Sequence, residues 1–156
     1  MIIGVDPGIT GALALIDGER FVRAFDMPAV TKTHGKGQEV NAYLLADIFS
    51  DALDLSRGEL TAHVEQVASM PGQGVSSMFS FGMSAGVVAG VIGAMGIKKV
   101  MVRPQAWKNS FGLKGKEKDA SRTLAISMYP EAAPILARKK DVGRADALLI
   151  ATYQPK

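Results

Sequence analysis

The sequence predicts an α/β fold in which helices cover both faces of a mixed five-stranded sheet. Two observations lead to this fold class: three strand-like runs follow one another at the N-terminus, and two later strand-like runs are separated by a helix-length segment. Strands joined by tight turns pair antiparallel, whereas strands joined through helices pair in parallel. Because the length of 156 residues suits one domain, we expect residues 1–156 to form a single domain.

The first three strands are expected at residues 1–6, 10–17 and 20–27. Pro7-Gly8 ends the first run, and Asp17-Gly18 is a hairpin signal between the second and the third. The third run alternates polar and apolar residues, as a half-buried strand does. Residues 29–38 are rich in threonine, lysine, histidine and glycine, and they predict an exposed loop.

The rest of the chain alternates helices with strands. Apolar residues at helical spacing predict an amphipathic helix within residues 39–57, with an acidic outer face. The same reasoning places strands at 60–67 and 98–103, and helices at 75–96, 104–112, 116–129 and 143–153. In the helix expected at residues 75–96, glycines recur every three or four residues, at Gly82, Gly86, Gly90 and Gly93. They predict very close packing, either against the sheet or against a second copy of the chain.

Composition excludes several classes of protein. The chain has no cysteine, so a disulfide scaffold and thiolate metal sites are excluded. The charge-free segment 67–97 holds only about fifteen mainly apolar residues in succession, fewer than the roughly 20 that a bilayer needs. We therefore expect a buried helix there and no membrane span. No basic region precedes an apolar run at the N-terminus, so we expect a cytoplasmic protein, bacterial or phage-encoded.

Charge is distributed unevenly along the chain. The formal net charge is −5 over residues 1–97 and +8 over residues 98–156. A basic segment beside an acidic one predicts a polyanionic partner held next to a carboxylate site. A solvated lysine-rich surface is the alternative.

Three acidic residues stand where a sheet would gather them. Asp6 ends the first strand, Glu65 lies near the end of the fourth, and Asp146 lies in the first turns of the last helix. Alone, each fits a structural role: a turn cap, an outward-facing strand residue and an anion near a helix N-terminus. Together, they predict carboxylates that converge at one edge of the fold.

These residues lie within three longer motifs. Residues 4–14 (GVDPGITGALA), 64–67 (VEQV) and 143–151 (GRADALLIA) closely resemble, in order, the acidic motifs of RuvC-type Holliday-junction resolvases. The resemblance covers almost the whole chain. It implies a ribonuclease H-like fold, a homodimer, and magnesium-dependent cutting of branched DNA, above all of four-way junctions.

The same resemblance implies roles for individual residues. Two Mg²⁺ ions, for which Mn²⁺ would substitute, can activate a water and stabilise the leaving oxygen of a phosphodiester. Asp6 would bridge the two ions, and Glu65 and Asp146 would each complete one site. Lys108 and Lys118 are the expected active-centre lysines. Further phosphate contacts are expected from Lys114, Lys116 and Arg122.

The chain departs from the family pattern at two positions. Gly143 stands where family members carry a fourth acidic residue or a histidine, so Asp141 becomes the candidate fourth ligand, with an N-cap as its alternative role. Ala68 replaces an aromatic residue that family members can insert at the junction centre. Met70, Phe79 and Phe81 are possible substitutes, although either phenylalanine is more readily explained as core.

Other side chains and other protein classes fit parts of the sequence. Trp107 and Phe111 are more readily explained as core than as a base-stacking surface, and His63 is expected on a strand surface. The Asp6–Thr10 segment also resembles the phosphate loop of actin-like ATPases, but those need two such domains and the chain is too short. Two alternatives stay open: a monomeric RuvC-like RNA-processing nuclease, distinguished by its oligomeric state, and an inactive junction-binding module.

Overall fold

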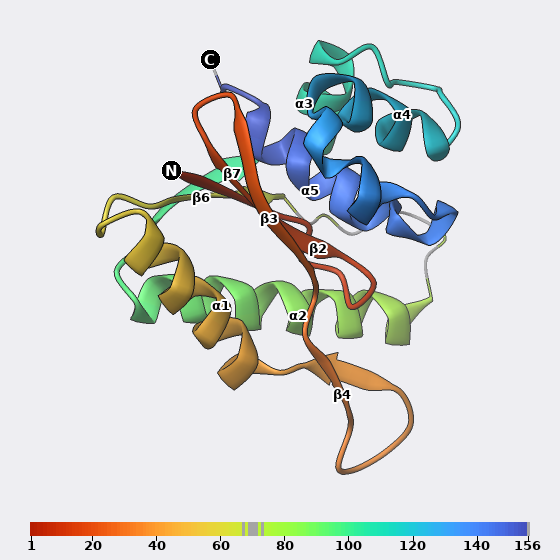
Figure 1. Ribbon diagram of the computed structural model, residues 1–156. Coiled ribbons are helices and arrows are strands. Elements are labelled where there is room, and N and C mark those ends of the chain that lie inside the picture. Colours follow the sequence, from red (N-terminus) through yellow and green to blue (C-terminus); the bar gives the residue numbers. More distant parts are fainter. Residues whose placement is uncertain (67, 69–71, 73, 156) are drawn as a thin grey trace.

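The computed structural model describes residues 1–66, 68, 72 and 74–155, and its centre is a five-stranded sheet (Figure 1). The strand order is β3-β2-β1-β6-β7. The bounds are Ile2–Val5 for β1, Ala12–Asp17 for β2, Arg20–Asp26 for β3, Thr61–Glu65 for β6 and Lys98–Val102 for β7. The first three strands pair antiparallel, and β1, β6 and β7 pair in parallel. The predicted mixed sheet is confirmed.

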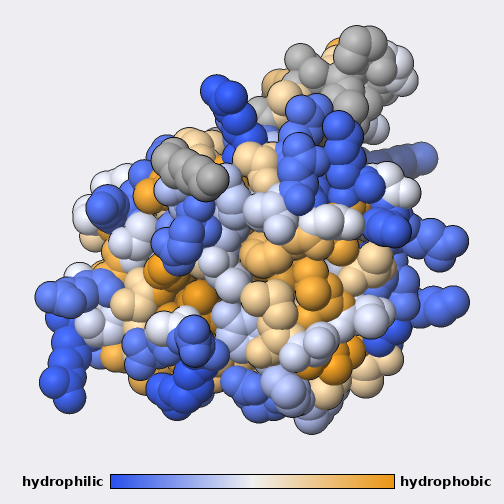
Figure 2. Space-filling view, turned by 90° about the horizontal axis from the view of Figure 1, so that it is seen from above, coloured by the Kyte–Doolittle hydropathy of each residue, from blue (hydrophilic) through white to orange (hydrophobic). Residues whose placement is uncertain are grey.

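Helices cover both faces of this sheet, as the sequence predicts. In Figure 1, α1 (Ala42–Leu55) and α2 (Val75–Ala94) lie below the sheet, and α5 (Val142–Thr152) lies above it with α3 (Pro104–Ser110) and α4 (Asp119–Met128). Two 3₁₀ turns, η1 (Pro130–Leu136) and η2 (Lys139–Asp141), join α4 to α5. Each face has its own apolar core, one around Phe49 and the other around Trp107 and Leu148. Figure 2 looks onto the side that carries α3, α4 and α5, where long hydrophilic side chains project around apolar surface.

Two local predictions were wrong. The expected loop at 29–38 contains a small hairpin, in which β4 (Ala29–Thr31) pairs antiparallel with β5 (Gln38–Val40). His63 is 4% exposed rather than on the surface, and its Nδ1 lies 3.3 Å from the carbonyl oxygen of Ile150 in α5. The reason is the position of β6, which is an inner strand with helices on both faces, so that neither side of it meets solvent.

The glycine-bearing helix α2 is packed differently from the expectation of a buried helix. Only Ser84, Val88 and Ile92 are buried, and they attach one side of α2 to the sheet. Within the described part of the chain, a Cβ added at any of the four glycines that recur from Gly82 to Gly93 would meet nothing within 4 Å. The glycines therefore do not pack against the sheet. Of the two alternatives, contact with a second copy remains.

The outer side of α2 is apolar. Val75, Phe79 and Met83, spaced four residues apart, are 79%, 68% and 55% exposed. Among the described residues, α2 is the one helix with the length and apolar composition of a membrane span, and 17% of that span is buried. However, its buried side belongs to the core under the sheet, so that withdrawing α2 into a bilayer would open that core.

Helix α5 lies very close to β1, and Gly4 makes this approach possible. A Cβ at Gly4 would overlap the carbonyl oxygen of Ala147 and would lie 2.5 Å from the backbone nitrogen of Ala151. Glycine therefore allows the helix backbone to rest directly on the strand. This contact fixes the start of α5 relative to the end of β1.

Candidate active site

Asp6 follows β1 and is held by a tight turn. The backbone N–H of Asp6 donates to the carbonyl oxygen of Ala12 at 3.0 Å, and the N–H of Gly8 donates to Asp6 Oδ1 at 3.3 Å. Gly11 closes the turn, because a Cβ there would overlap the Asp6 carbonyl oxygen and lie 2.8 Å from its Cγ. Burial raises the pKa of the Asp6 carboxyl above its usual range.

Glu65 lies beside Asp6 because β1 and β6 are parallel neighbours. Val5 is paired with Val64, so Asp6 and Glu65 are the next residues of the two strands. The indole Nε1–H of Trp107 donates to Glu65 Oε1 at 2.8 Å. Burial raises the pKa of Glu65, the Trp107 hydrogen bond lowers it, and the charges of Asp6 and Asp146 raise it.

Asp146 reaches the same place from α5. Burial and the nearby charge of Asp6 raise the pKa of Asp146 to about 6. The structure therefore brings Asp6, Glu65 and Asp146 near enough for their charges to act on one another. Because the charge of Asp6 raises the pKa of both Glu65 and Asp146, and that of Asp146 raises the pKa of Glu65, a cation between them would lower their electrostatic energy.

Lysines line the open side of this carboxylate group. Asp6 and Asp146 lie in a cleft of about 800 Å³ whose lysines are Lys108, Lys114, Lys116, Lys118, Lys139 and Lys140. The positive charge of Lys108 lowers the pKa of all three carboxyls, and Lys118 acts on Asp146. Arg122 instead donates to Asp119 at 2.7 and 2.9 Å and to the carbonyl oxygen of Leu136 at 3.0 Å.

Known proteins share this arrangement of strands and helices. No family model matches the chain. A solved structure described as Thermus thermophilus RuvC in complex with a Holliday junction substrate superposes with a TM-score of 0.59, at 16% identity over 96% of this chain and 89% of that one. The chain has the RuvC fold. A second structure of Thermus thermophilus RuvC gives a TM-score of 0.53, over 96% of this chain and 90% of the other.

Sequence similarity to a curated protein is consistent with this fold. The chain is 40% identical over 95 residues to the chloroplastic Holliday junction resolvase MOC1 of Chlamydomonas reinhardtii. The match covers 60% of this chain but only 11% of that protein. The resemblance to RuvC-type resolvases that the three acidic motifs predict is thus confirmed.

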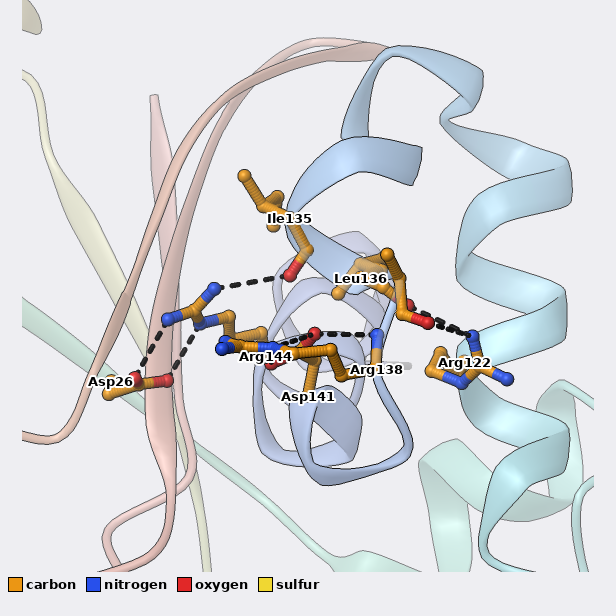
Figure 3. A network of polar contacts seen from close by, with 8 residues as sticks. Asp26, Arg122, Ile135, Leu136, Arg138, Asp141 and Arg144 are labelled. Atoms are coloured by element: carbon orange, nitrogen blue, oxygen red, sulfur yellow. Dashed lines mark hydrogen bonds and ion pairs between the residues drawn. The ribbon is translucent and has the colours of Figure 1, made fainter.

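The side chain of Asp141, the candidate fourth ligand, is engaged in an ion pair with Arg138 (Figure 3). Its side chain is 3% exposed, and its two oxygens accept from the Arg138 backbone N–H and from Arg138 Nη2, each at 2.8 Å. Asp141 does stand at the N-cap position of α5, as the alternative role predicts, but among the contacts of the described residues its side chain makes no capping bond to α5 and instead closes a capping box with Arg138 in η2. Asp141 could join the metal ligands only by giving up this ion pair.

Gly143 stands where the resemblance implies a fourth acidic residue or a histidine, and its packing explains why no side chain is present there. A Cβ at Gly143 would lie 2.9 Å from the carbonyl oxygen of Thr10. The start of α5 is therefore packed against the turn that follows Asp6. A carboxylate or an imidazole fits at this position only if the turn and the helix separate.

Sequence reasoning missed Lys139 and Lys140, which lie in η2 between Arg138 and Asp141. The Arg138–Asp141 ion pair closes this turn, and Arg144 in α5 donates to both carboxylate oxygens of Asp26 at 2.7 Å. Figure 3 shows that Arg144 joins α5 to Asp26 of β3 and to the carbonyl oxygen of Ile135, and that Arg122 of α4 donates to the carbonyl oxygen of Leu136. The signal in the sequence was a pair of lysines seven and six residues before Asp146.

The candidate for the wedge at the junction centre is only partly described. Met70 lies outside the described residues. Phe79 is 68% exposed, so the expectation that it belongs to the core was wrong. Phe81 is half-buried, and its ring would lie 3.5 Å from a Cβ at Gly8, next to the turn that holds Asp6.

The residues present suit Mg²⁺, although they do not form a closed cage. Among the described residues, no three Asp, Glu or His side chains are close enough together to hold one ion. Magnesium prefers hard oxygen ligands, keeps several waters, and is often bound by one or two carboxylates plus substrate phosphates. Two pairs that share Asp6, one with Glu65 and one with Asp146, fit this requirement.

We expect Asp141→Asn to reduce stability without changing the magnesium requirement. Asparagine loses the ion pair with Arg138, which we expect to cost about 1–3 kcal/mol. Because the Arg138 hydrogen bond lowers the pKa of Asp141, the loss should be full at neutral pH and should vanish as the pH falls below the folded pKa. Thermal melts at pH 7 and pH 3, with a Mg²⁺ titration of activity, check this. A raised Mg²⁺ requirement with an unchanged melting temperature would restore Asp141 as a ligand.

Asp146→Asn should have the opposite effect on the metal-free protein. The folded pKa of about 6 lies above the unfolded value, so ionised Asp146 destabilises the fold, beginning near pH 4 and fully above about pH 6. We expect the asparagine variant to melt several degrees higher than wild type at pH 8 and at the same temperature at pH 4. The exposed Asp47→Asn on α1 serves as the control. Equal melting temperatures at pH 8 would show that Asp146 is well solvated.

Proposed function

We propose that this chain is a Mg²⁺-dependent endonuclease that resolves four-way DNA junctions by paired, symmetric phosphodiester incisions. One observation carries the proposal: Asp6, Glu65 and Asp146, from three separate motifs, meet at one edge of a RuvC-type sheet beside a lysine-lined cleft. The names of the sequence relative and of the fold neighbour support branched DNA as the substrate. A cytoplasmic location remains a prediction from the sequence.

Each residue of the proposed site has its own task. Bound Mg²⁺ would lower the pKa of a water and neutralise charge on the leaving oxygen. Asp6, Glu65 and Asp146 would hold the ions, with Asp6 contributing together with each of the other two. Lys108, whose charge acts on all three carboxyls, and Lys118 would offset the negative charge of the reacting phosphate.

The other lysines of the cleft serve to hold DNA. Lys114, Lys116, Lys139 and Lys140 lie along the same cleft, whereas Lys108 and Lys118 are the lysines whose charges lower the pKa of the carboxyls. Contacts of this type position the sugar–phosphate backbone and carry no sequence information. Their contribution to binding should weaken as salt concentration rises.

Paired incisions require two active sites, and we propose a homodimer that supplies them. A twofold dimer has the symmetry of two strands of like polarity in a junction. The apolar outer side of α2, with Val75, Phe79 and Met83, is the surface that a second copy would cover. Its exposed glycines would allow two copies of α2 to approach closely.

We expect Gly86→Leu to produce a folded monomer that binds junctions poorly. The added side chain meets open space within the described chain, so the fold should tolerate it, whereas a closely packed helix pair should not. Analytical ultracentrifugation with and without junction DNA measures the effect. Ser127→Leu, on the exposed side of α4, is the matched control. A dimer that survives Gly86→Leu places the interface elsewhere.

The direct test is cleavage of a synthetic four-way junction, compared with a linear duplex and a structured RNA. We expect symmetric nicks in the junction with Mg²⁺ or Mn²⁺ and none with EDTA. Junction binding without cutting would favour the inactive binding module. A monomer that cuts RNA but not the junction would favour the RNA-processing nuclease.

A further inference from the structure

We infer that Trp107 is a positioning residue that orients Glu65 and Lys108 together, an inference that rests on the proposed active site. Trp107 is fully buried, and its Nε1–H donates to Glu65 Oε1 at 2.8 Å. The adjacent Lys108 has its Nζ 5.1 Å from the centroid of the Trp107 ring. One indole therefore contacts both the carboxylate and the lysine that faces the carboxylate group.

The topology explains how this contact arises. β6 and β7 are parallel, and Glu65 is paired with Val102 at the end of β7. Helix α3 begins two residues later with Pro104, whose fixed φ suits a first helical position. Trp107 is thereby placed one turn into α3, directly beside Glu65. The short helix turns toward the site with Trp107 inside and Lys108 in the cleft.

A buried indole N–H needs an acceptor, but many neutral carbonyl groups would serve. Here the acceptor is a carboxylate at a strand end, and the bond occupies Oε1 only. We therefore expect Oε2 to be the Glu65 oxygen that is available to a cation. A side chain that is held in place loses less entropy on binding, so Trp107 should raise metal affinity without contacting the metal.

Trp107→Phe separates this role from simple packing, because it keeps an aromatic ring and removes the donor. We expect Mn²⁺ binding, measured by electron paramagnetic resonance on the DNA-free protein, to weaken about tenfold, as expected for loss of a hydrogen bond to a charged group. In a Glu65→Gln background, the same substitution should have little further effect, since the carboxylate that Trp107 orients is already absent. Phe111→Leu, an aromatic loss at the end of α3, should leave Mn²⁺ affinity unchanged.

The wild-type protein offers a second measurement that does not depend on any Trp107 variant folding. Trp107 is the single tryptophan, so its indole N–H gives one NMR signal. We expect that signal to move when Mg²⁺ is added and when Glu65 is replaced by Gln, but not in Asp47→Asn. A folded Trp107→Phe with wild-type Mn²⁺ affinity, or an indole signal indifferent to Mg²⁺, would overturn the inference. If the Mn²⁺ effect is seen but junctions are not cut, the inference stands and the proposed function fails.

Discussion

Asp6→Asn is expected to abolish junction cleavage, by about 10³-fold or more, while junction binding stays the same or becomes tighter. The charge of Asp6 acts on both Glu65 and Asp146. Replacing the carboxylate by an amide removes its negative charge and one of its two oxygens, so neither of the two proposed metal positions that share it would be complete. Binding should not weaken, because the lost charge repels DNA phosphates.

Two assays on the same preparation check this expectation. A gel-shift titration without metal measures binding, and single-turnover cleavage with Mg²⁺ and with Mn²⁺ measures chemistry. Asp17→Asn, a half-exposed carboxylate at the other end of the meander, is the control and should cut normally. Substantial metal-dependent cutting by Asp6→Asn would remove Asp6 from the active site and, with it, the proposed arrangement.

The second large effect is expected from a single methyl group. Gly11→Ala places a Cβ against the backbone oxygen and the carboxyl carbon of Asp6, so the turn must open or Asp6 must move. We expect a loss of about 1–3 kcal/mol of stability from this overpacking. Cleavage should fall by at least about 100-fold, since a displacement of about 1 Å can cost that much.

Gly8→Ala is the matched variant, because it lies in the same turn. A Cβ at Gly8 would make only ordinary contacts, 3.5 Å from the Phe81 ring and 3.6 Å from Asp6 Oδ1. It should therefore remain folded and active. If both alanine variants lose activity equally while their melting temperatures are unchanged, the turn tolerates no added side chain at either position. The loss is then not specific to the Gly11 contact.

The parts of the molecule that follow from local sequence patterns were predictable. The antiparallel meander, the parallel strands and the helices on both faces agree with the structure, because hydrophobic period and turn residues encode them. The convergence of Asp6 and Glu65 also followed, since strand ends in a sheet meet at one edge. That Asp146 lies near these two residues was predicted from its sequence motif and from its position in the first turns of a helix.

What could not be predicted depends on contacts between distant segments. The burial of His63 requires knowing that α5 lies over β6. The ion pair of Asp141 is formed by a turn whose residues show no regular period. Likewise, Lys139 and Lys140 line the cleft because hydrogen bonds from Arg122 and Arg144 fix the segment before α5. Arg122 is engaged in that contact rather than in the cleft. The exposed side of α2 was missed because an apolar helix normally indicates burial.

The direct contact of α5 with β1 at Gly4 has a consequence for how the proposed active site would fail on heating. Asp6 and Asp146 are each within a few residues of that contact, where the backbones of β1 and α5 lie directly against each other. Their separation is thus a property of the folded core and does not depend on a closing segment. Thermal inactivation should coincide with cooperative unfolding of the sheet, with little softening of the site at lower temperatures.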